Sequence, residues 1–272
     1  MNKLSVNGLN VWFGKQRDRV NAVKGATFDV AQGESFGLVG ESGSGKSVTA
    51  LSVMGLVASP PGVITGGAVH FDGEDIVGAP YETLRSLRGR RAAYIFQDPL
   101  ATLHPLYRVG DQLVEAIRSH RAIGKAEGRA KAIELLQAVR IPNAEKRITD
   151  YPHEMSGGMR QRVGIAMALA NDPDIIIADE PTTALDVTVQ AQIMDLLTRM
   201  CDELGVTIVM LTHELGLLSS VADRVMILYA GHRLELGPAS AVFGTPAHPY
   251  TQGWLLSSPG ISGPDEALMS IP

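Results

Sequence analysis

Apolar and polar residues alternate along residues 1–33, and glycines and asparagines interrupt the alternation at intervals. The stretches LSVNGLNVWFG and ATFDVAQGE carry this pattern, and GGAVHFDGEDI (66–76) repeats it further along the chain. A period of two, with turn residues between the apolar runs, is typical of short antiparallel strands. We therefore predict an antiparallel β region at the start of the chain.

Beyond this region, short apolar runs alternate with helical patterns such as SVTALSVMGL (47–56). Apolar runs of this kind are typical of parallel strands that are buried on both faces. Because strands alternate with helices, we predict an α/β fold with a mostly parallel sheet. The predicted strands are ESFGLVG (34–40), AAYIFQ (92–97), DIIIADE (174–180), VTIVMLTH (206–213) and RVMILYAG (224–231).

Residues 110–140 hold two helical patterns without a strand pattern, and Pro142 ends the second. We predict a helical insertion over about residues 99–165, between strands of the main sheet. A further helix begins after Ser156, a residue type that caps helix N-termini. The tail, residues 240–272, is richer in Pro, Gly and Ser and is predicted to be a small appendage.

The composition narrows the classes of function. The chain has 272 residues, enough for one large domain or a core with a smaller lobe, and a formal net charge of -5. No half of the chain is strongly basic, so the composition gives no support for binding to nucleic acid. The densest positive cluster, Arg85, Arg88, Arg90 and Arg91, is interpreted as solvated surface. The single cysteine, Cys201, cannot form an internal disulfide and is interpreted as an ordinary helix residue.

No segment approaches the roughly 20 continuous apolar residues that a membrane-spanning helix needs. The N-terminus does not have the pattern of a signal peptide, because polar residues interrupt its apolar positions. If the protein works at a membrane, another chain must supply the part that spans it.

The segment GESGSGKS (40–47) fits the phosphate-loop pattern G-x-x-x-x-G-K-[ST] and lies between a predicted strand and a predicted helix. Glycines let backbone N–H groups turn onto phosphate oxygens, and the positive end of the helix dipole points at the same anion. Lys46 adds a full charge for the β- and γ-phosphates, and Ser47 offers a hydroxyl to Mg²⁺. The residues predicted to bind the nucleotide are Gly40, Glu41, Ser42, Gly43, Ser44, Gly45, Lys46, Ser47 and Val48.

Three other predicted strands end in polar residues: Gln97, the pair Asp179 and Glu180, and His213. In open α/β sheets, ligands bind beyond the carboxyl ends of the strands, so these side chains are expected near the phosphate loop. Asp179 is predicted to hold Mg²⁺ through a water, and Glu180 to polarise the attacking water.

Gln97 can reach the metal or the attacking water, and His213 can contact the γ-phosphate. Each also has a structural alternative. Gln97 could be a strand-end cap, and His213 a hydrogen-bonded structural histidine.

The segment MSGGMRQRV (155–163) places Ser156, Gly157 and Gly158 at a helix start, which gives a second anion-binding end without a lysine. With this segment, the chain resembles the ATP-binding-cassette ATPases over residues 1 to about 240. Six motifs stand in the family's order: the phosphate loop (40–47), the Gln97 loop, the signature MSGGM (155–159), IIIADE (175–180), the TALD turn (183–186) and His213.

The resemblance implies a phosphate-loop, RecA-like fold with a mostly parallel sheet core, an N-terminal antiparallel β subdomain and an inserted helical subdomain. It also implies that ATP and Mg²⁺ bind between two subunits arranged head to tail. Ser156, Gly157 and Gly158 would then serve the partner's ATP, and Asp186 would communicate across the interface. Adenine would stack on an aromatic residue upstream of the phosphate loop. Phe13 is the best candidate and Trp12 the second, because the insertion KQRDR (15–19) leaves the alignment open, and the structural alternative is that both rings pack in the β subdomain.

Two positions depart from the family's signature. Met155 stands where leucine is usual, and Met159 where glutamine is frequent. Methionine keeps the apolar character and the approximate volume of leucine, so no loss of activity is expected from the first change.

Narrower features resemble the ATPases of dipeptide, oligopeptide and nickel importers, namely residues 85–112, YPHEMSGGMRQRV (151–163) and HPYTQGWLLSSP (248–259). His104 stands where that subfamily usually has asparagine, in a region that faces the membrane subunits. Several relatives carry a longer, cysteine-rich tail with an iron–sulfur cluster. This chain has no cysteine there, so no cluster is predicted.

The resemblance therefore implies an ATPase that converts ATP and water to ADP and phosphate and energises an importer for peptides, with nickel as the alternative solute. Its partners would be a second ATPase, identical or different, two transmembrane permease subunits and, indirectly, an extracytoplasmic solute-binding protein. The protein would lie peripherally on the cytoplasmic face of the plasma (inner) membrane. Residues 1–240 would form the nucleotide-binding domain, and residues 241–272 a short C-terminal extension.

Other classes fit less well. The ATP-binding subunit of the carbon–phosphorus lyase complex resembles the same subfamily and is the alternative enzyme. A nonhydrolytic binding module is disfavoured by the intact Lys46, Asp179, Glu180 and His213. Translation-type cassette proteins normally carry two cassettes in one chain, and exporters usually fuse the membrane domain.

Overall fold

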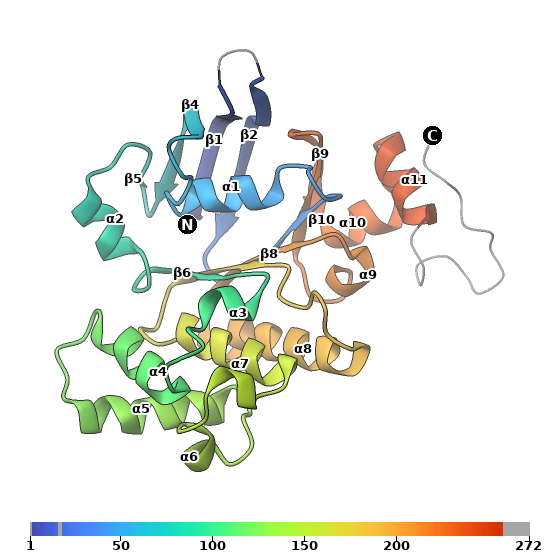
Figure 1. Ribbon diagram of the computed structural model, residues 1–272. Coiled ribbons are helices and arrows are strands. Elements are labelled where there is room, and N and C mark those ends of the chain that lie inside the picture. Colours follow the sequence, from blue (N-terminus) through green and yellow to red (C-terminus); the bar gives the residue numbers. More distant parts are fainter. Residues whose placement is uncertain (1, 16–17, 258–272) are drawn as a thin grey trace. The chain divides into compact units, whose positions relative to one another are not determined.

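The computed structural model describes residues 2–15 and 18–257, and these divide into two compact units (Figure 1). The first unit joins Met1–Ala79 to Thr207–Pro272, and the second is Pro80–Val206. Part of the KQRDR segment and the last part of the predicted C-terminal extension (258–272) lie outside the described residues.

The first unit contains an antiparallel sheet with the strand order β2-β1-β4-β5. The predicted antiparallel β region is confirmed, but the expectation of short strands was wrong, because two strands of 12 residues form there. The glycines that suggested turns lie inside these strands instead. Gly8 and Gly25 have φ angles of 60° and 69°, and the pairing register shifts beside Gly8, as at β-bulges. The strands are β1 (Asn2–Phe13), β2 (Val20–Ala31), β4 (Gly62–Phe71) and β5 (Glu74–Asp75).

The same unit contains the parallel strands that the apolar runs predict. β3 (Ser35–Val39) lies between β8 (Thr207–Thr212) and β9 (Arg224–Tyr229) and is parallel to both. Every residue of β3 and β8 is buried, as expected for strands covered on both faces. α1 (Lys46–Val53) packs against β1 and β2 (Figure 1). The remaining elements of this part are α9 (Leu215–Leu218) and β10 (His232–Pro238), which pairs antiparallel with β9.

The C-terminal part of the first unit forms two helices, α10 (Ala239–Gly244) and α11 (Pro249–Ser257). Glu235 accepts hydrogen bonds from the backbone N–H groups of Ala247 and His248, at 2.8 and 3.3 Å, just before α11 begins. The Tyr250 ring lies 4.6 Å from that of Tyr229 on β9. Burial raises the pKa of the Tyr250 hydroxyl, and the nearby carboxylate of Glu41 raises it further. The extension therefore lies beside the phosphate loop.

Replacing Glu235 by glutamine is expected to weaken the attachment of α11. Burial alone would raise the pKa of Glu235, but the hydrogen bonds from the backbone N–H groups of Ala247 and His248, the nearby Thr251 hydroxyl and the charge of His248 outweigh it and lower the pKa. A lowered pKa means that the carboxylate stabilises the fold above its unfolded pKa of about 4.3, and that this contribution is lost as the pH falls through the folded pKa. Because Glu235 is half-exposed, we expect a loss of about 1 kcal/mol or less at pH 7.

The measurement is hydrogen exchange of α11 together with the thermal midpoint, at pH 7 and at successively lower pH. Wild type and Glu235→Gln should differ at pH 7 and converge in acid. The exposed Glu134→Gln on the second unit is the matched control and should show no difference. A difference that persists unchanged in acid would contradict this account of the anchor.

The second unit has two parallel strands, β6 (Ala92–Ile95) and β7 (Ile175–Asp179), with helices between them. β6 is shorter than the predicted strand, because it ends two residues before Gln97. α4, α5 and α7 pack on one another, and α7 contacts β6 (Figure 1). The helices are α2 (Tyr81–Leu87), α3 (Pro99–Thr102), α4 (Val109–Arg118), α5 (Lys125–Ala138), α6 (Ala144–Arg147), the 3-10 helix η1 (Pro152–Glu154), α7 (Gly157–Ala168) and α8 (Val187–Leu204).

The helix α8 buries one apolar stripe, which includes Ile193, Leu197 and Met200. Cys201 lies on the same stripe and is buried, so its interpretation as a helix residue is confirmed. Within residues 2–15 and 18–257, no helix combines the length and the apolar character needed to cross a bilayer.

Candidate active site

The phosphate loop of the first unit connects β3 to α1. Gly45 has a φ of 102°, and a Cβ added to it would lie only 2.4 Å from the carbonyl oxygen of Ala22. A side chain at this position would meet both backbone strain and a clash, so glycine is required there. Gly43 also has a positive φ, of 79°, but its surroundings are open.

Lys46 stabilises the loop from inside. Its Nζ donates to the carbonyl oxygens of Gly40 and Glu41, at 2.6 and 3.0 Å, and the residue is buried. The loop residues Glu41, Ser42 and Gly43 are exposed, as is Ser47 in the first turn of α1. The exposed backbone N–H groups of the loop and of the start of α1 can donate to phosphate oxygens, and the Ser47 hydroxyl can reach a cation bound there.

The strand pairing of the first unit brings His213 to the same edge as this loop. Val39 of β3 pairs with Thr212 of β8, and the Gly40 N–H donates to the Thr212 carbonyl at 3.4 Å. His213 directly follows Thr212 and is exposed. The predicted neighbourhood of the phosphate loop and His213 therefore follows from the register of two parallel strands.

Phe13 ends β1 and is half-buried, like its neighbour Trp12. A Cβ added to Gly62 would lie 2.9 Å from the Phe13 ring, so this glycine makes room for the aromatic side chain. Stacking of adenine on Phe13 or on Trp12 stays a prediction.

In the second unit, Gln97 and Glu180 contact each other directly. The Gln97 amide donates to Oε2 of Glu180 at 3.0 Å, and the Thr183 hydroxyl donates to the same oxygen at 3.0 Å. Glu180 has a φ of 46°, a left-handed conformation that is uncommon for a residue with a side chain. The strand ends at Asp179, and the two hydrogen bonds hold the next carboxylate in place.

Asp179, the other carboxylate of this strand end, is bound by a residue that sequence reasoning missed. The Tyr94 hydroxyl donates to Oδ2 of Asp179 at 2.7 Å. Burial, followed by the Asp179 charge and this hydrogen bond, raises the pKa of Tyr94 well above its usual range. The sequence did contain one signal for this contact, a tyrosine within an otherwise apolar predicted strand. Its hydrogen-bond partner could not be predicted, because the partner depends on how β6 pairs with β7.

The signature segment and the TALD turn contact each other in the second unit. Ser156 caps α7 by accepting from the Met159 N–H at 3.3 Å, and Asp186 caps α8 by accepting from the Val189 N–H at 3.0 Å. A Cβ added to Gly158 would lie 2.6 Å from a methyl carbon of Val189, so the glycine is needed for this close approach. Gly157 and Ser156 are exposed, whereas Met155 is buried.

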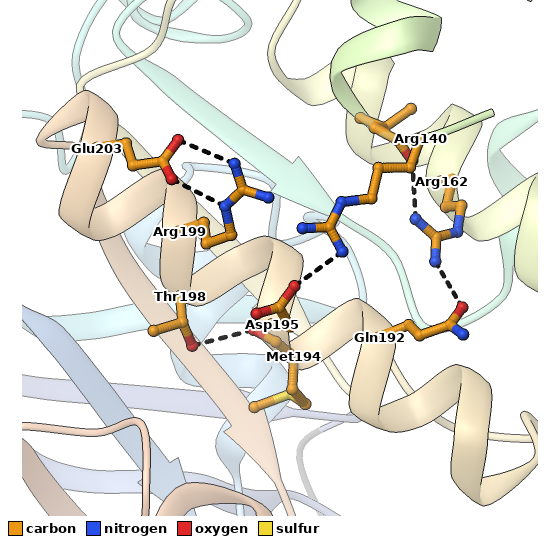
Figure 2. Close-up of polar contacts among 9 residues, drawn as sticks. Arg140, Arg162, Gln192, Met194, Asp195, Thr198, Arg199 and Glu203 are labelled. Atoms are coloured by element: carbon orange, nitrogen blue, oxygen red, sulfur yellow. Dashed lines mark hydrogen bonds and ion pairs between the residues drawn. The ribbon is translucent and has the colours of Figure 1, made fainter.

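Figure 2 shows how the signature helix is tied to α8. Arg162 of α7 donates to the Val139 carbonyl at 2.8 Å and to Oε1 of Gln192 at 2.9 Å. Arg140, which follows Val139, forms an ion pair with Asp195 at 2.9 Å. Burial and the charge of Arg140 lower the pKa of Arg162. The Arg162–Gln192 bond thus joins α7 to α8, and Val139 and Arg140 at the end of α5 bind to α7 and α8, respectively.

Replacing Ser156 by alanine is expected to cost about 1 kcal/mol of stability, because it removes the cap of α7. Replacing Ser156 by aspartate keeps a capping oxygen but adds a negative charge where a partner's ATP is predicted to bind. We expect Ser156→Ala to lower the thermal midpoint by about 2–4 °C and Ser156→Asp to leave it near wild type.

ATP-driven dimerisation, measured by light scattering, should be lost in Ser156→Asp because of repulsion between like charges. Ser156→Thr retains a hydroxyl and is the matched control. Normal dimerisation of the aspartate variant would show that Ser156 does not face the nucleotide.

The donor set fits a magnesium nucleotide better than a metal held by protein alone. Among the described residues, no group of three or more His, Cys, Asp or Glu side chains is placed to hold a metal. Mg²⁺ is usually held by one or two carboxylates together with water and substrate phosphates, and the Asp179 carboxylate is a ligand of that kind. The roles of the Ser47 hydroxyl and the Gln97 amide as further ligands stay predictions. The phosphate loop and His213 belong to the first unit, and Gln97, Asp179, Glu180, the signature and Asp186 to the second.

A buried parallel strand, a glycine-rich loop with an inward lysine and a helix opening at that loop define a phosphate-loop nucleotide-binding protein. The two capped helices of the signature and the TALD turn narrow this class. The family described as ABC transporter matches residues 23–183, and the chain belongs to it. This membership confirms the predicted class of ATP-binding ATPase.

Named relatives match nearly the whole chain. A Brucella abortus protein named for peptide import ATP binding is 49% identical over 269 residues, which are 99% of this chain and 81% of that protein. The oligopeptide transport ATP-binding protein OppD of Salmonella typhimurium is 46% identical over 99% of this chain and 80% of its own length. OppD of Bacillus subtilis is 45% identical over 99% of this chain and 75% of its own length.

Solved structures confirm the fold class. The ATP-binding cassette MJ0796, a dimer in a post-hydrolysis state with ADP and Pi, superimposes with a TM-score of 0.77 at 28% identity, covering 87% of this chain and 98% of its own. The protein cbiO1 of Clostridium perfringens, part of a cbiONQ transporter complex, gives a TM-score of 0.75 at 28% identity, covering 90% and 91%.

Proposed function

We propose that this chain is the ATP-hydrolysing subunit of a membrane importer for peptides. The observation that carries the hydrolytic role is the position of Glu180, which directly follows Asp179 and is held by Gln97 and Thr183. The peptide substrate is supported by identities of 45–49% to peptide and oligopeptide import ATP-binding proteins over 99% of the chain.

In this proposal, backbone N–H groups of residues 40–48 and Lys46 bind the phosphates of ATP. Ser47, Gln97 and Asp179 would hold Mg²⁺, and the cation would supply positive charge to offset the negative charge of the phosphates. Glu180 accepts a hydrogen bond and then a proton from the attacking water. The water oxygen bonds to the γ-phosphorus as the bond from that phosphorus to the bridging oxygen of ADP breaks, so that phosphate and ADP are released. His213 donates a hydrogen bond to the γ-phosphate and stabilises the negative charge that develops as the phosphate leaves. Phe13 stacks on adenine.

The proposal of a second ATPase as partner is supported by two exposed helix-cap residues. Ser156 and Asp186 are exposed, so the signature and the TALD turn can face the ATP of a second cassette, identical or different. Two permease subunits would span the membrane, and a solute-binding protein would act through them. The chain would lie at the cytoplasmic face of the membrane, with residues 1–240 as the nucleotide-binding domain and 241–272 as a C-terminal extension.

The test uses the gene in its own host. Deletion is expected to abolish uptake of radiolabelled trialanine, while uptake of free alanine is unchanged. Wild type should restore trialanine uptake, and Lys46→Ala should not. Unchanged trialanine uptake in the deletion strain would contradict the proposal that the importer transports peptides. A defect limited to growth on methylphosphonate as the phosphorus source would identify the carbon–phosphorus lyase alternative instead.

A further inference from the structure

The contact between Tyr94 and Asp179 follows from the register of two parallel strands. Tyr94 of β6 pairs with Ile177 of β7. Side chains two residues apart on a strand lie on the same face, so Asp179 lies on the face of Ile177, one step closer to the carboxyl end. A tyrosine side chain is long enough to cover that step, and the 2.7 Å distance from its hydroxyl to Oδ2 of Asp179 shows that it does.

Packing holds both the Tyr94 ring, which carries the donor hydroxyl, and the Asp179 carboxylate, which accepts the hydrogen bond. The Tyr94 ring lies 4.6 Å from the ring of Phe96, at an interplanar angle of 46°, the tilted arrangement that aromatic pairs prefer. Asp179 is only 7% exposed, so its carboxylate has little water around it to compete with the phenol. A hydrogen bond to an ionised oxygen in such surroundings is among the stronger ones in proteins.

We propose that Tyr94 is a positioning residue that orients the Asp179 carboxylate for Mg²⁺. The inference rests on the proposed function, in which Asp179 belongs to the magnesium site. The terminal torsion of an aspartate is broad, and a hydrogen bond to one oxygen restricts it to a single orientation. A phenol adds no positive charge, so the carboxylate keeps its full charge for the cation. Groups that orient a metal ligand in this way typically change metal affinity or activity about 10–100-fold when they are removed.

The test replaces Tyr94 by phenylalanine, which keeps the ring and its contact with Phe96 and removes only the hydroxyl. Binding of Mn²⁺ in the presence of a nonhydrolysable ATP analogue is followed through the electron paramagnetic resonance signal of free Mn²⁺. We expect about tenfold weaker Mn²⁺ binding, the lower end of the range, because the proposed contact to the metal runs through water. Binding of the same analogue in EDTA should be unchanged.

The Mg²⁺ dependence of ATP hydrolysis gives a second readout. For Tyr94→Phe, the Mg²⁺ concentration for half-maximal rate should rise about tenfold, while the rate at saturating Mg²⁺ approaches that of wild type. General loss of structure would lower the saturating rate and the nucleotide affinity together. Tyr81→Phe, which removes a hydroxyl from an exposed ring in the same unit, is the matched control.

A second variant, Tyr94→Leu, removes the ring as well and separates packing from hydrogen bonding. If both variants lose Mn²⁺ affinity equally, the hydroxyl carries the effect, as proposed. If only the leucine variant loses affinity, or if Tyr94→Phe equals wild type, the inference is wrong although the proposed function stands. If wild type itself binds no Mn²⁺ with the nucleotide, the proposed function fails and the inference fails with it.

Discussion

Glu180→Gln is expected to lower ATP hydrolysis by about a hundredfold or more, because a positioned base contributes on the order of 10²–10⁴ to a rate. Glutamine keeps the size of the side chain and retains one oxygen, which can still accept from Thr183. ATP binding should therefore persist, and ATP-bound dimers should accumulate because they no longer turn over. Phosphate release and light scattering with ATP and Mg²⁺ measure the two effects.

Glu134→Gln, a change at an exposed position on α5, should hydrolyse ATP like wild type. Turnover of Glu180→Gln at the wild-type rate would mean that another group polarises the water. Absence of both hydrolysis and dimerisation in wild type alone would rule out self-pairing, and the second ATPase would then be a different chain.

The backbone at the end of β7 explains how two consecutive carboxylates can serve one site. A regular strand would direct Asp179 and Glu180 to opposite faces. The left-handed φ of 46° at Glu180 ends the strand, and its side chain then contacts Gln97 and Thr183. Conformations of this kind cost on the order of 1–3 kcal/mol and persist where the surroundings hold them.

The parts of the fold with local determinants could be predicted from the sequence. The phosphate loop needs glycines, a lysine and a following helix, all of which are neighbours in the chain. The buried strands β3, β7 and β8 are continuous apolar runs, and the Ser156 cap precedes its helix directly. In each case, the residues that determine the element lie within about ten positions of it.

Features that depend on pairing between distant segments could not be predicted. The glycines of β1 and β2 looked like turns because a bulge and a turn use the same residue type. β10 was missed because its sequence, HRLELGP, has no continuous apolar run and is recognisable only beside β9. The Tyr94–Asp179 bond joins residues 85 positions apart and requires the register of two strands.

Gly158 shows how one residue can serve both folding and function. The sequence assigns it to an anion-binding helix start, and the structure also gives it close contact with Val189, whose N–H is bound by Asp186. A Cβ at position 158 would lie 2.6 Å from a Val189 methyl carbon, so a larger residue there would force the Val189 side chain or the start of α8 to shift, which connects the signature to α8. This connection lies within the second unit, as do the Arg162 bonds to Val139 and Gln192 (Figure 2).

Lys46→Ala is expected to weaken ATP binding about a hundredfold, which corresponds to about 2.7 kcal/mol. The variant loses the charge that would face the β- and γ-phosphates, and it also loses the two hydrogen bonds to the carbonyls of Gly40 and Glu41. Charge-assisted contacts to phosphate are stronger than neutral hydrogen bonds, so the loss of binding should exceed the loss of stability. Calorimetric titration with ATP measures the affinity.

The thermal midpoint separates the two losses. Without nucleotide, Lys46→Ala should unfold at a slightly lower temperature, because the phosphate loop loses its internal bonds. With ATP, wild type should gain stability by mass action, and the variant should gain almost none at the same ATP concentration. Lys125→Ala, at an exposed position in the second unit, should behave like wild type in both conditions. An equal ATP-dependent gain in Lys46→Ala and wild type would mean that Lys46 serves the loop alone and that the phosphates are bound by the backbone and the start of α1.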